Sequence, residues 1–162
     1  ERMGSGWKAR KRSWVRMRKA LRLETNNYFA HFLGKRRHVG RLVFDDAEEE
    51  LEIAVRMASH EVRGGGLHET RDLRALSGGE KSFVTLSFML ALGESMCIPF
   101  RVMDEFDVFM DEANRRAAYD TIVKTANEAV HRQFIFITPH SLPNIRASPL
   151  VNIQRLLPPD RN

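Results

Sequence analysis

Two short motifs in this chain of 162 residues have the residue types of a site that binds and cleaves phosphate groups. The first is the sequence L-S-G-G-E at residues 76–80. The second is the acidic pair Asp104 and Glu105, which ends the mostly apolar segment 98–103. Together they predict two parts of a phosphoryl-transfer site.

The first motif predicts a helix that begins just after Ser77. The free backbone N–H groups and the positive dipole end of such a helix bind anions, and Gly78 and Gly79 let a phosphate approach the backbone closely. A plain capping box is the structural alternative, because Ser77 and Glu80 have the S-x-x-E spacing. Both roles can coexist, and a capping box would not by itself require the two glycines.

The acidic pair follows a strand predicted over residues 100–103, and ligands of α/β sheets bind at such strand ends. In a phosphoryl-transfer site, Asp104 would hold Mg²⁺ directly or through water, and Glu105 would orient and deprotonate the attacking water. An isolated Asp-Glu pair is more commonly a turn that caps the next helix. Because a phosphate-type helix start precedes this pair, the catalytic interpretation is favoured.

Further polar residues follow both central strands. Asp107 and Asp111 continue the acidic segment, and Asp111 is also a good N-cap for the next helix, so a structural role is at least as well supported. His140 lies just beyond a strand predicted over 133–138 and could contact a γ-phosphate. A histidine in a proline-flanked loop is more often simply exposed.

A glycine-rich loop of the form G-x-x-x-x-G-K-[S/T], which cradles the α- and β-phosphates of ATP, does not occur in the sequence. Lys81 and Ser82 resemble its end, but Glu80 precedes them and residues 70–75 contain no glycine. We therefore expect half of an active site, inactive in isolation. Since residue 1 is not methionine, we also expect a fragment of a longer protein.

The spacing of apolar residues predicts an α/β domain around these motifs. Long helices alternating with short apolar strands favour a parallel sheet, in which Arg101 is the one misfit. The acidic run 45–50 is predicted to be a solvated turn, and the glycines at 64–66 a flexible loop. The predicted helices cover residues 7–33, 78–92 and 112–130, and the predicted strands cover 39–44, 51–57, 100–103, 133–138 (buried) and 151–157 (an edge strand).

The first predicted helix ends at Gly34 and carries apolar residues at seven-residue spacing: Trp7, Trp14, Leu21 and Tyr28. This spacing favours a coiled-coil partner outside the chain, although polar residues interrupt the second heptad register. The alternative is an amphipathic helix packed on its own domain.

Charge is concentrated at the same end. Residues 1–41 hold 13 Lys and Arg against 2 Asp and Glu, a net charge of +11, whereas the remainder carries −6. A basic block of this kind is a plausible footprint for a nucleic-acid backbone, and a solvated helix face is an equally supported alternative. Cys97 is the single cysteine, which excludes an internal disulfide and favours a reducing compartment.

The order L-S-G-G-E, strand, D-E, and a second aspartate seven residues after the first resembles the C-terminal lobe of ABC-type ATPase heads. Within that superfamily, D-E-F-D-V-F-M-D at residues 104–111 resembles the structural-maintenance-of-chromosomes (SMC) family rather than transporters, whose segment usually begins D-E-P-T. Phe106, the M-D ending and Thr138-Pro139 are most similar to the sixth eukaryotic SMC paralogue. The resemblance is strong over residues 73–145.

The resemblance implies a role for each candidate residue. Residues 77–79, the signature motif, would contact the γ-phosphate of ATP held by the opposite head. Asp104 would serve Mg²⁺, Glu105 would be the catalytic base, and Asp111 would belong to the loop that crosses the dimer interface. The family's switch histidine usually follows the strand within one residue, where this chain has a proline, and His140 is the residue assigned to that role.

The resemblance also implies a larger machine. Residues 1–33 would be the end of a coiled coil and residues 34–162 an α/β C-terminal head lobe, completed by the N-terminal lobe of the same protein, a partner SMC head, a kleisin subunit and DNA. ATP would clamp two heads and hydrolysis would release them, in DNA repair, recombination and chromosome organisation in the nucleus. One alternative is a non-catalytic lobe that binds DNA or a kleisin. Another is the related double-strand-break-repair ATPase, disfavoured because residues 106–111 fit the SMC pattern better.

Overall fold

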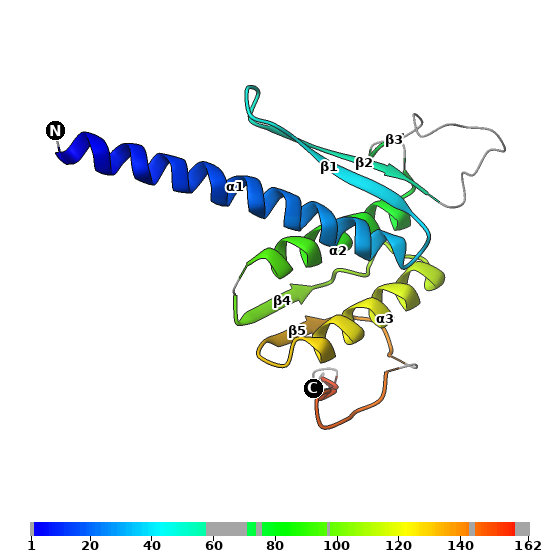
Figure 1. Ribbon diagram of the computed structural model, residues 1–162. Helices are drawn as coiled ribbons and strands as arrows, with labels where there is room; N and C mark the ends of the chain where they lie inside the picture. The colour runs from blue at the N-terminus through cyan, green and yellow to red at the C-terminus, as the bar shows by residue number, and fades with distance from the viewer. Residues whose placement is uncertain (1, 58–70, 74–75, 97, 143–144, 158–162) are drawn as a thin grey trace, which may run out of the picture.

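The computed structural model describes residues 2–57, 71–73, 76–96, 98–142 and 145–157, so the predicted loop at 64–66 lies outside the described residues. The α/β class is confirmed. Among the described residues, no helix has the length and apolar character needed to cross a membrane. The elements are α1 (Arg2–Gly34), β1 (Val39–Asp45), β2 (Glu50–Arg56), β3 (Arg71–Asp72), α2 (Gly78–Ser95), β4 (Phe100–Asp104), α3 (Glu112–Glu128) and β5 (Gln133–Ile137) (Figure 1).

The described strands form two sheets. β1, β2 and β3 are antiparallel neighbours in that order, whereas β4 and β5 pair in parallel. The predicted parallel sheet is therefore confirmed for β4 and β5, the two strands that the candidate site residues Asp104 and His140 end or follow. The prediction of an edge strand at 151–157 is wrong, because residues 152–157 form no strand. A single isolated bridge joins Ser148 to Val151.

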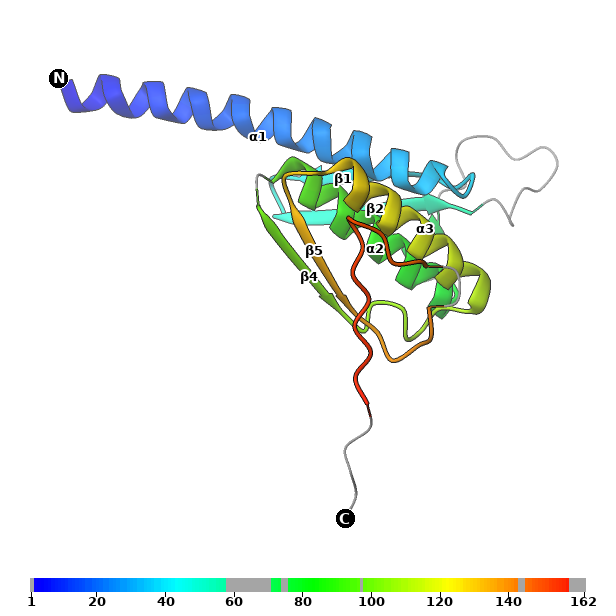
Figure 2. The same cartoon turned by 90° about the horizontal axis from the view of Figure 1, so that it is seen from below.

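The long helix α1 packs on the domain with its C-terminal half and extends beyond it with its N-terminal half (Figures 1 and 2). Phe29 and Leu33 are fully buried, and they join Phe83 and Leu90 of α2 in the main apolar core. The heptad residues of the projecting half remain exposed, Trp7 by 66% and Trp14 by 50%. The projecting half thus presents an uncovered apolar stripe.

The acidic turn between β1 and β2 is more than a solvated turn. Asp46 accepts hydrogen bonds from Arg22 at 2.9 Å and from Arg18 at 3.1 Å, both on α1. The hydrogen bond from Arg22 holds the pKa of Asp46 below its ordinary value. These ion pairs tie the middle of α1 to the hairpin.

Arg101, the apparent misfit of β4, is buried. Its guanidinium donates to Glu94 Oε1 at 3.0 Å and to the backbone oxygen of Gly93, and lies 5.1 Å from the ring centroid of Phe134. Glu94 also pairs with Arg132 at 2.9 Å. Because the buried charge of Arg101 is paired with that of Glu94, Arg101 joins β4 to the end of α2 instead of disrupting the strand.

The opposite face of the β4–β5 pair is apolar and exposed. α2 and α3 cover one face of the pair, and no described element covers the other (Figure 2). The strand predicted at 133–138 is present as β5, but the prediction that it is buried is wrong, because alternate residues of β5 are exposed. This uncovered face carries Phe100 (61% exposed), Val102 (60%), Ile135 (41%) and Ile137 (48%).

Candidate functional site

The parallel pairing of β4 and β5 places the acidic pair at the carboxyl end of a sheet. Asp104 is the last residue of β4, opposite Ile137, and the Glu105 N–H donates to the Ile137 oxygen at 3.0 Å. Both acidic residues are exposed. Their carboxylates are therefore accessible where α/β proteins bind ligands.

The backbone of Glu105 is strained. Its φ is +48°, in the left-handed region that costs a residue with a side chain about 1–2 kcal/mol. Strain of this kind gathers at functional sites, where it orients a side chain at the expense of stability. At Glu105 it coincides with the residue proposed from the sequence as the base.

The start of α2 has the predicted capping box. Ser77 Oγ accepts from the Glu80 N–H at 3.3 Å, and Glu80 Oε2 accepts from the Ser77 N–H at 2.9 Å. The structural role of this pair is confirmed. It leaves the need for the two glycines unexplained.

The two glycines differ in their surroundings. A Cβ at Gly79 would lie 3.1 Å from both Asn114 Nδ2 and Asp111 Oδ2, so packing against the next helix start favours glycine there. A Cβ at Gly78 would meet nothing within 4 Å. Packing within the described residues therefore does not require Gly78, which leaves open space beside the amino end of α2 for a ligand.

Asp111 caps α3, as the structural alternative predicted. Its Oδ1 accepts from the Asn114 N–H at 2.8 Å and its Oδ2 from Asn114 Nδ2 at 2.6 Å, and these bonds lower the pKa of Asp111. Arg36, just after α1, donates to Asn114 Oδ1 and lies 5.6 Å from the ring centroid of Phe83 on α2. The signature motif, Asp111 and the end of α1 thus meet in one place.

Asp107 has a role that the sequence pattern did not indicate. It is fully buried, and its Oδ2 accepts from Tyr119 Oη at 2.5 Å and Thr138 Oγ1 at 2.8 Å, with Arg115 Nε at 3.7 Å. Burial, with the hydrogen bond to Asp107, raises the pKa of Tyr119 to about 12. No local signal marks Asp107 as a buried residue, because its partners lie 12 and 31 residues away.

His140 is half-buried, not freely exposed. Its backbone N–H donates to Thr138 Oγ1 at 3.1 Å, and its Nε2 is buried without a hydrogen-bond partner among the described residues. A buried ring nitrogen without a partner is costly unless a ligand satisfies it. The phosphate contact predicted for His140 stays a prediction.

A magnesium site would depend on few protein ligands. Within the described part of the chain, no three His, Cys, Asp or Glu side chains converge as a metal cage. Mg²⁺ in nucleotide sites usually takes one or two carboxylates with phosphate oxygens and water. The exposed carboxylate of Asp104 fits that donor set.

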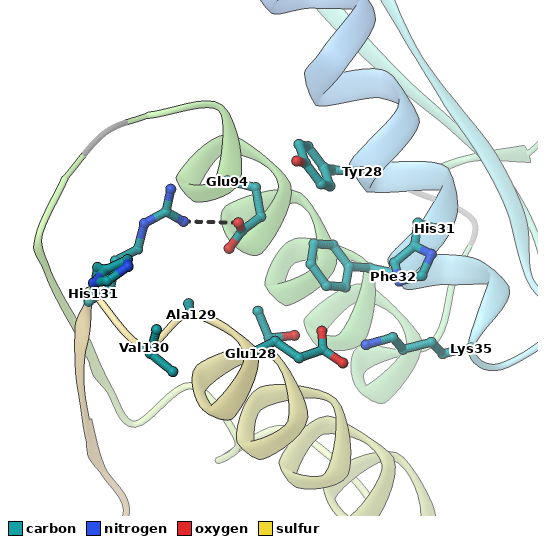
Figure 3. Close-up of a pocket in the computed structure, with 11 residues that line it drawn as sticks. Tyr28, His31, Phe32, Lys35, Glu94, Glu128, Ala129, Val130 and His131 are labelled. Carbon is teal, nitrogen blue, oxygen red and sulfur yellow. Dashed lines mark hydrogen bonds and ion pairs between the residues drawn. The ribbon is translucent and has the colours of Figure 1, made fainter. Parts of the chain in front are cut away.

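A separate pocket of about 310 Å³ lies between α1, α2 and the end of α3, and Figure 3 shows its lining. It contains the Glu94–Arg132 ion pair and Lys35, whose pKa is lowered by partial burial. None of the site residues predicted from the sequence lines it. The pocket is therefore distinct from the candidate phosphate-handling residues.

Comparison with known proteins connects these features. The family model described as "RecF/RecN/SMC N terminal domain" matches residues 10–155. The chain is 39% identical over 159 residues to "Structural maintenance of chromosomes protein 6" of Homo sapiens, covering 98% of this chain and 14% of that protein. The protein of the same name from Dictyostelium discoideum is 39% identical over 152 residues, covering 94% of this chain and 13% of its own length. The chain thus spans about one seventh of these relatives.

Solved structures agree with the sequence relatives. One, described as "Structural biochemistry of ATP-driven dimerization and DNA stimulated activation of SMC ATPases", has a TM-score of 0.61 at 27% identity over 78% of this chain and 72% of that chain. Another, an SMC head bound to the C-terminal winged-helix domain of ScpA, has a TM-score of 0.59 at 28% identity over 82% of this chain and 38% of that chain. The described fold is that of SMC head domains.

Proposed function

This chain belongs to the RecF/RecN/SMC N-terminal domain family, and we propose that it forms the C-terminal lobe of an ATP-hydrolysing head in an SMC complex that acts in DNA repair and chromosome organisation. Residues 1–33 form the end of the coiled coil and residues 34–162 the lobe. The observation that carries the proposal is the acidic pair at the carboxyl end of β4, with Glu105 strained at φ +48°.

The acidic pair divides two tasks. Asp104 holds Mg²⁺, which supplies charge neutralisation on the phosphates when it is bound with ATP. Glu105 orients the attacking water and takes its proton. Because both carboxylates are exposed at the strand end, they can reach a nucleotide held outside this chain.

The signature motif acts on ATP held by a partner head. The amino end of α2 offers backbone N–H groups, and the open space at Gly78 lets a γ-phosphate approach them. Asp111 lies against the same helix start, so the position of α2 constrains the loop that carries Asp111. We assign a further γ-phosphate contact to His140, in the loop after β5.

Other parts of the machine must complete the site. The sequence contains no phosphate loop, and the uncovered apolar face of β4–β5 is suited to packing against another lobe. We assign that face to the N-terminal lobe of the same protein. A partner SMC head, a kleisin subunit and nuclear, chromosomal DNA are the other proposed partners, consistent with a related head bound to ScpA.

The proposal is tested by joining this lobe to its N-terminal half and measuring association with the partner head. We expect association only with ATP, and neither tight ATP binding nor turnover by the 162-residue chain itself. Magnesium-dependent turnover by the isolated chain, or head association independent of ATP, would contradict the proposal. Binding to DNA or a kleisin without any ATP dependence would favour the scaffold alternative.

The projecting half of α1 permits a second test, of the DNA partner. If its exposed cations bind phosphates, replacing them with glutamine should weaken DNA binding and reduce the log-log salt slope by roughly 0.9 for each duplex phosphate that is no longer neutralised. Arg18 is left unchanged because it pairs with Asp46. The replaced residues are Lys8, Arg10, Lys11, Arg12, Arg16 and Lys19.

The matched control replaces Trp7, Trp14 and Leu21 with alanine, which removes the exposed apolar stripe and leaves the charge. This variant should keep the salt slope and lose helix pairing, because heptad positions serve coiled-coil packing. An unchanged slope in the glutamine variant, with loss of kleisin or coiled-coil association, would show that the charge is a solvated face of a protein-binding helix.

A further inference from the structure

Asp107 joins three elements that are distant in the sequence. It lies in the loop after β4, and its carboxylate binds Tyr119 of α3 and Thr138 just after β5. It is fully buried, and its Oδ1 has no hydrogen-bond partner among the described residues. Burying a carboxylate with incomplete pairing costs free energy, and the cation that pairs with Asp107 among the described residues is Arg115, whose Nε lies 3.7 Å from Oδ2.

The available protons give the network a direction. Tyr119 and Thr138 each have one hydroxyl proton, and both protons can go to Asp107 Oδ2, at 2.5 and 2.8 Å. Thr138 Oγ1 is then free to accept the backbone N–H of His140 at 3.1 Å. The chain of donors thus runs from His140 through Thr138 to Asp107, with Tyr119 as the second donor.

The backbone of the loop that carries the base is held on both sides of Glu105. The Asp107 backbone oxygen accepts from the Met110 N–H at 3.0 Å, and the Glu105 N–H is held by Ile137 at 3.0 Å, one residue before Thr138. Glu105 is therefore confined between two anchors, the β5 backbone and buried Asp107. Its φ of +48° needs such anchors, because an unsupported chain would relax.

We infer that Asp107, Tyr119 and Thr138 form a positioning unit that holds Glu105 and His140 in register across the ends of β4 and β5. This inference rests on the proposed function, in which Glu105 is the base and His140 meets the γ-phosphate. None of the three residues touches the nucleotide. They act by fixing where the two reacting side chains stand.

The test uses the full-length protein assembled with its partner head. Thr138→Val removes the bridging hydroxyl while keeping the shape, and Tyr119→Phe removes the second donor. Each should lower kcat for ATP hydrolysis about tenfold, a small part of the roughly 10²- to 10⁴-fold that a positioned base contributes. KM for ATP should stay within about twofold, because interactions realised mainly in the transition state affect kcat.

Two further variants separate positioning from folding. Thr138→Ser restores the hydroxyl and should recover most of the kcat that Thr138→Val loses. Tyr28→Phe removes a hydroxyl from a half-buried tyrosine on α1, outside the network, and should leave kcat unchanged. Thermal melting of every variant is measured alongside.

The result expected is a fall in kcat at near-constant KM in Thr138→Val and Tyr119→Phe, with rescue by serine. Parental kcat in both variants would overturn the inference, as would losses that follow melting temperature and are not rescued by serine. Glu105→Gln distinguishes this failure from that of the proposed function. If Glu105→Gln abolishes hydrolysis while Thr138→Val and Tyr119→Phe do not lower it, the positioning unit fails and the base assignment stands.

Discussion

Replacing Glu105 with glutamine in the assembled two-head complex should slow ATP hydrolysis by about 10²- to 10⁴-fold, the usual contribution of a general base. Glutamine keeps the shape and much of the hydrogen bonding of glutamate but cannot take a proton from water. ATP binding and head closure do not need that proton transfer. The ATP-bound dimer should therefore form normally and live longer than the parental dimer.

The measurement is phosphate release together with the lifetime of the closed dimer. Glu112→Gln is the matched control, since its side chain is 83% exposed and pairs only with Arg116 on the same helix among the described residues. This control should hydrolyse ATP at the parental rate. Parental turnover by Glu105→Gln would show that Glu105 is not the base.

Replacing Gly78 with valine should abolish ATP-dependent head association and, with it, hydrolysis. The valine side chain would occupy open space in this lobe, because a Cβ at Gly78 meets nothing within 4 Å. The capping box between Ser77 and Glu80 uses other atoms and stays intact. The side chain would instead fill the space assigned to the γ-phosphate of the opposite head.

Thr85→Val provides the control for this substitution, because Thr85 is exposed on the same helix and receives the same side chain. Both variants should melt close to the parental temperature, and Thr85→Val should associate normally with ATP. Normal ATP-dependent association of Gly78→Val would show that residues 77–80 are a capping box and nothing more. Loss of association together with a large fall in melting temperature would show that the valine side chain disturbs the lobe itself. That result would contradict the open space at Gly78.

Local patterns in the sequence are sufficient to predict the helices and strands that carry the candidate site. The S-x-x-E spacing predicts both hydrogen bonds of the capping box, and the N-cap at Asp111 follows in the same way. The strand before Asp104 and the helix after Asp111 lie within a few residues of their predicted bounds. These features depend on neighbours within one or two turns of the chain, so their physics is local.

Partners distant in the sequence decide the remainder. Arg101 looks like a misfit in the sequence because Glu94 and Phe134 reach it from other elements, and Asp46 looks solvated because its partners are on α1. The prediction of an edge strand at 151–157 fails because no described strand pairs with it. An apolar pattern indicates that a segment can form a strand, but the strand forms only where a neighbouring strand completes its backbone hydrogen bonds.

Asp107 shows this division most clearly. Its sequence context, an aspartate in an acidic turn, is that of an exposed residue. Only the tertiary structure brings Tyr119 and Thr138 to its carboxylate and buries it completely. The residue types needed for phosphoryl transfer can thus be recognised from the sequence, because chemistry depends on type and order. The residues that position them cannot be recognised in this way, because buried hydrogen bonds depend on which side chains the fold brings within about 3 Å.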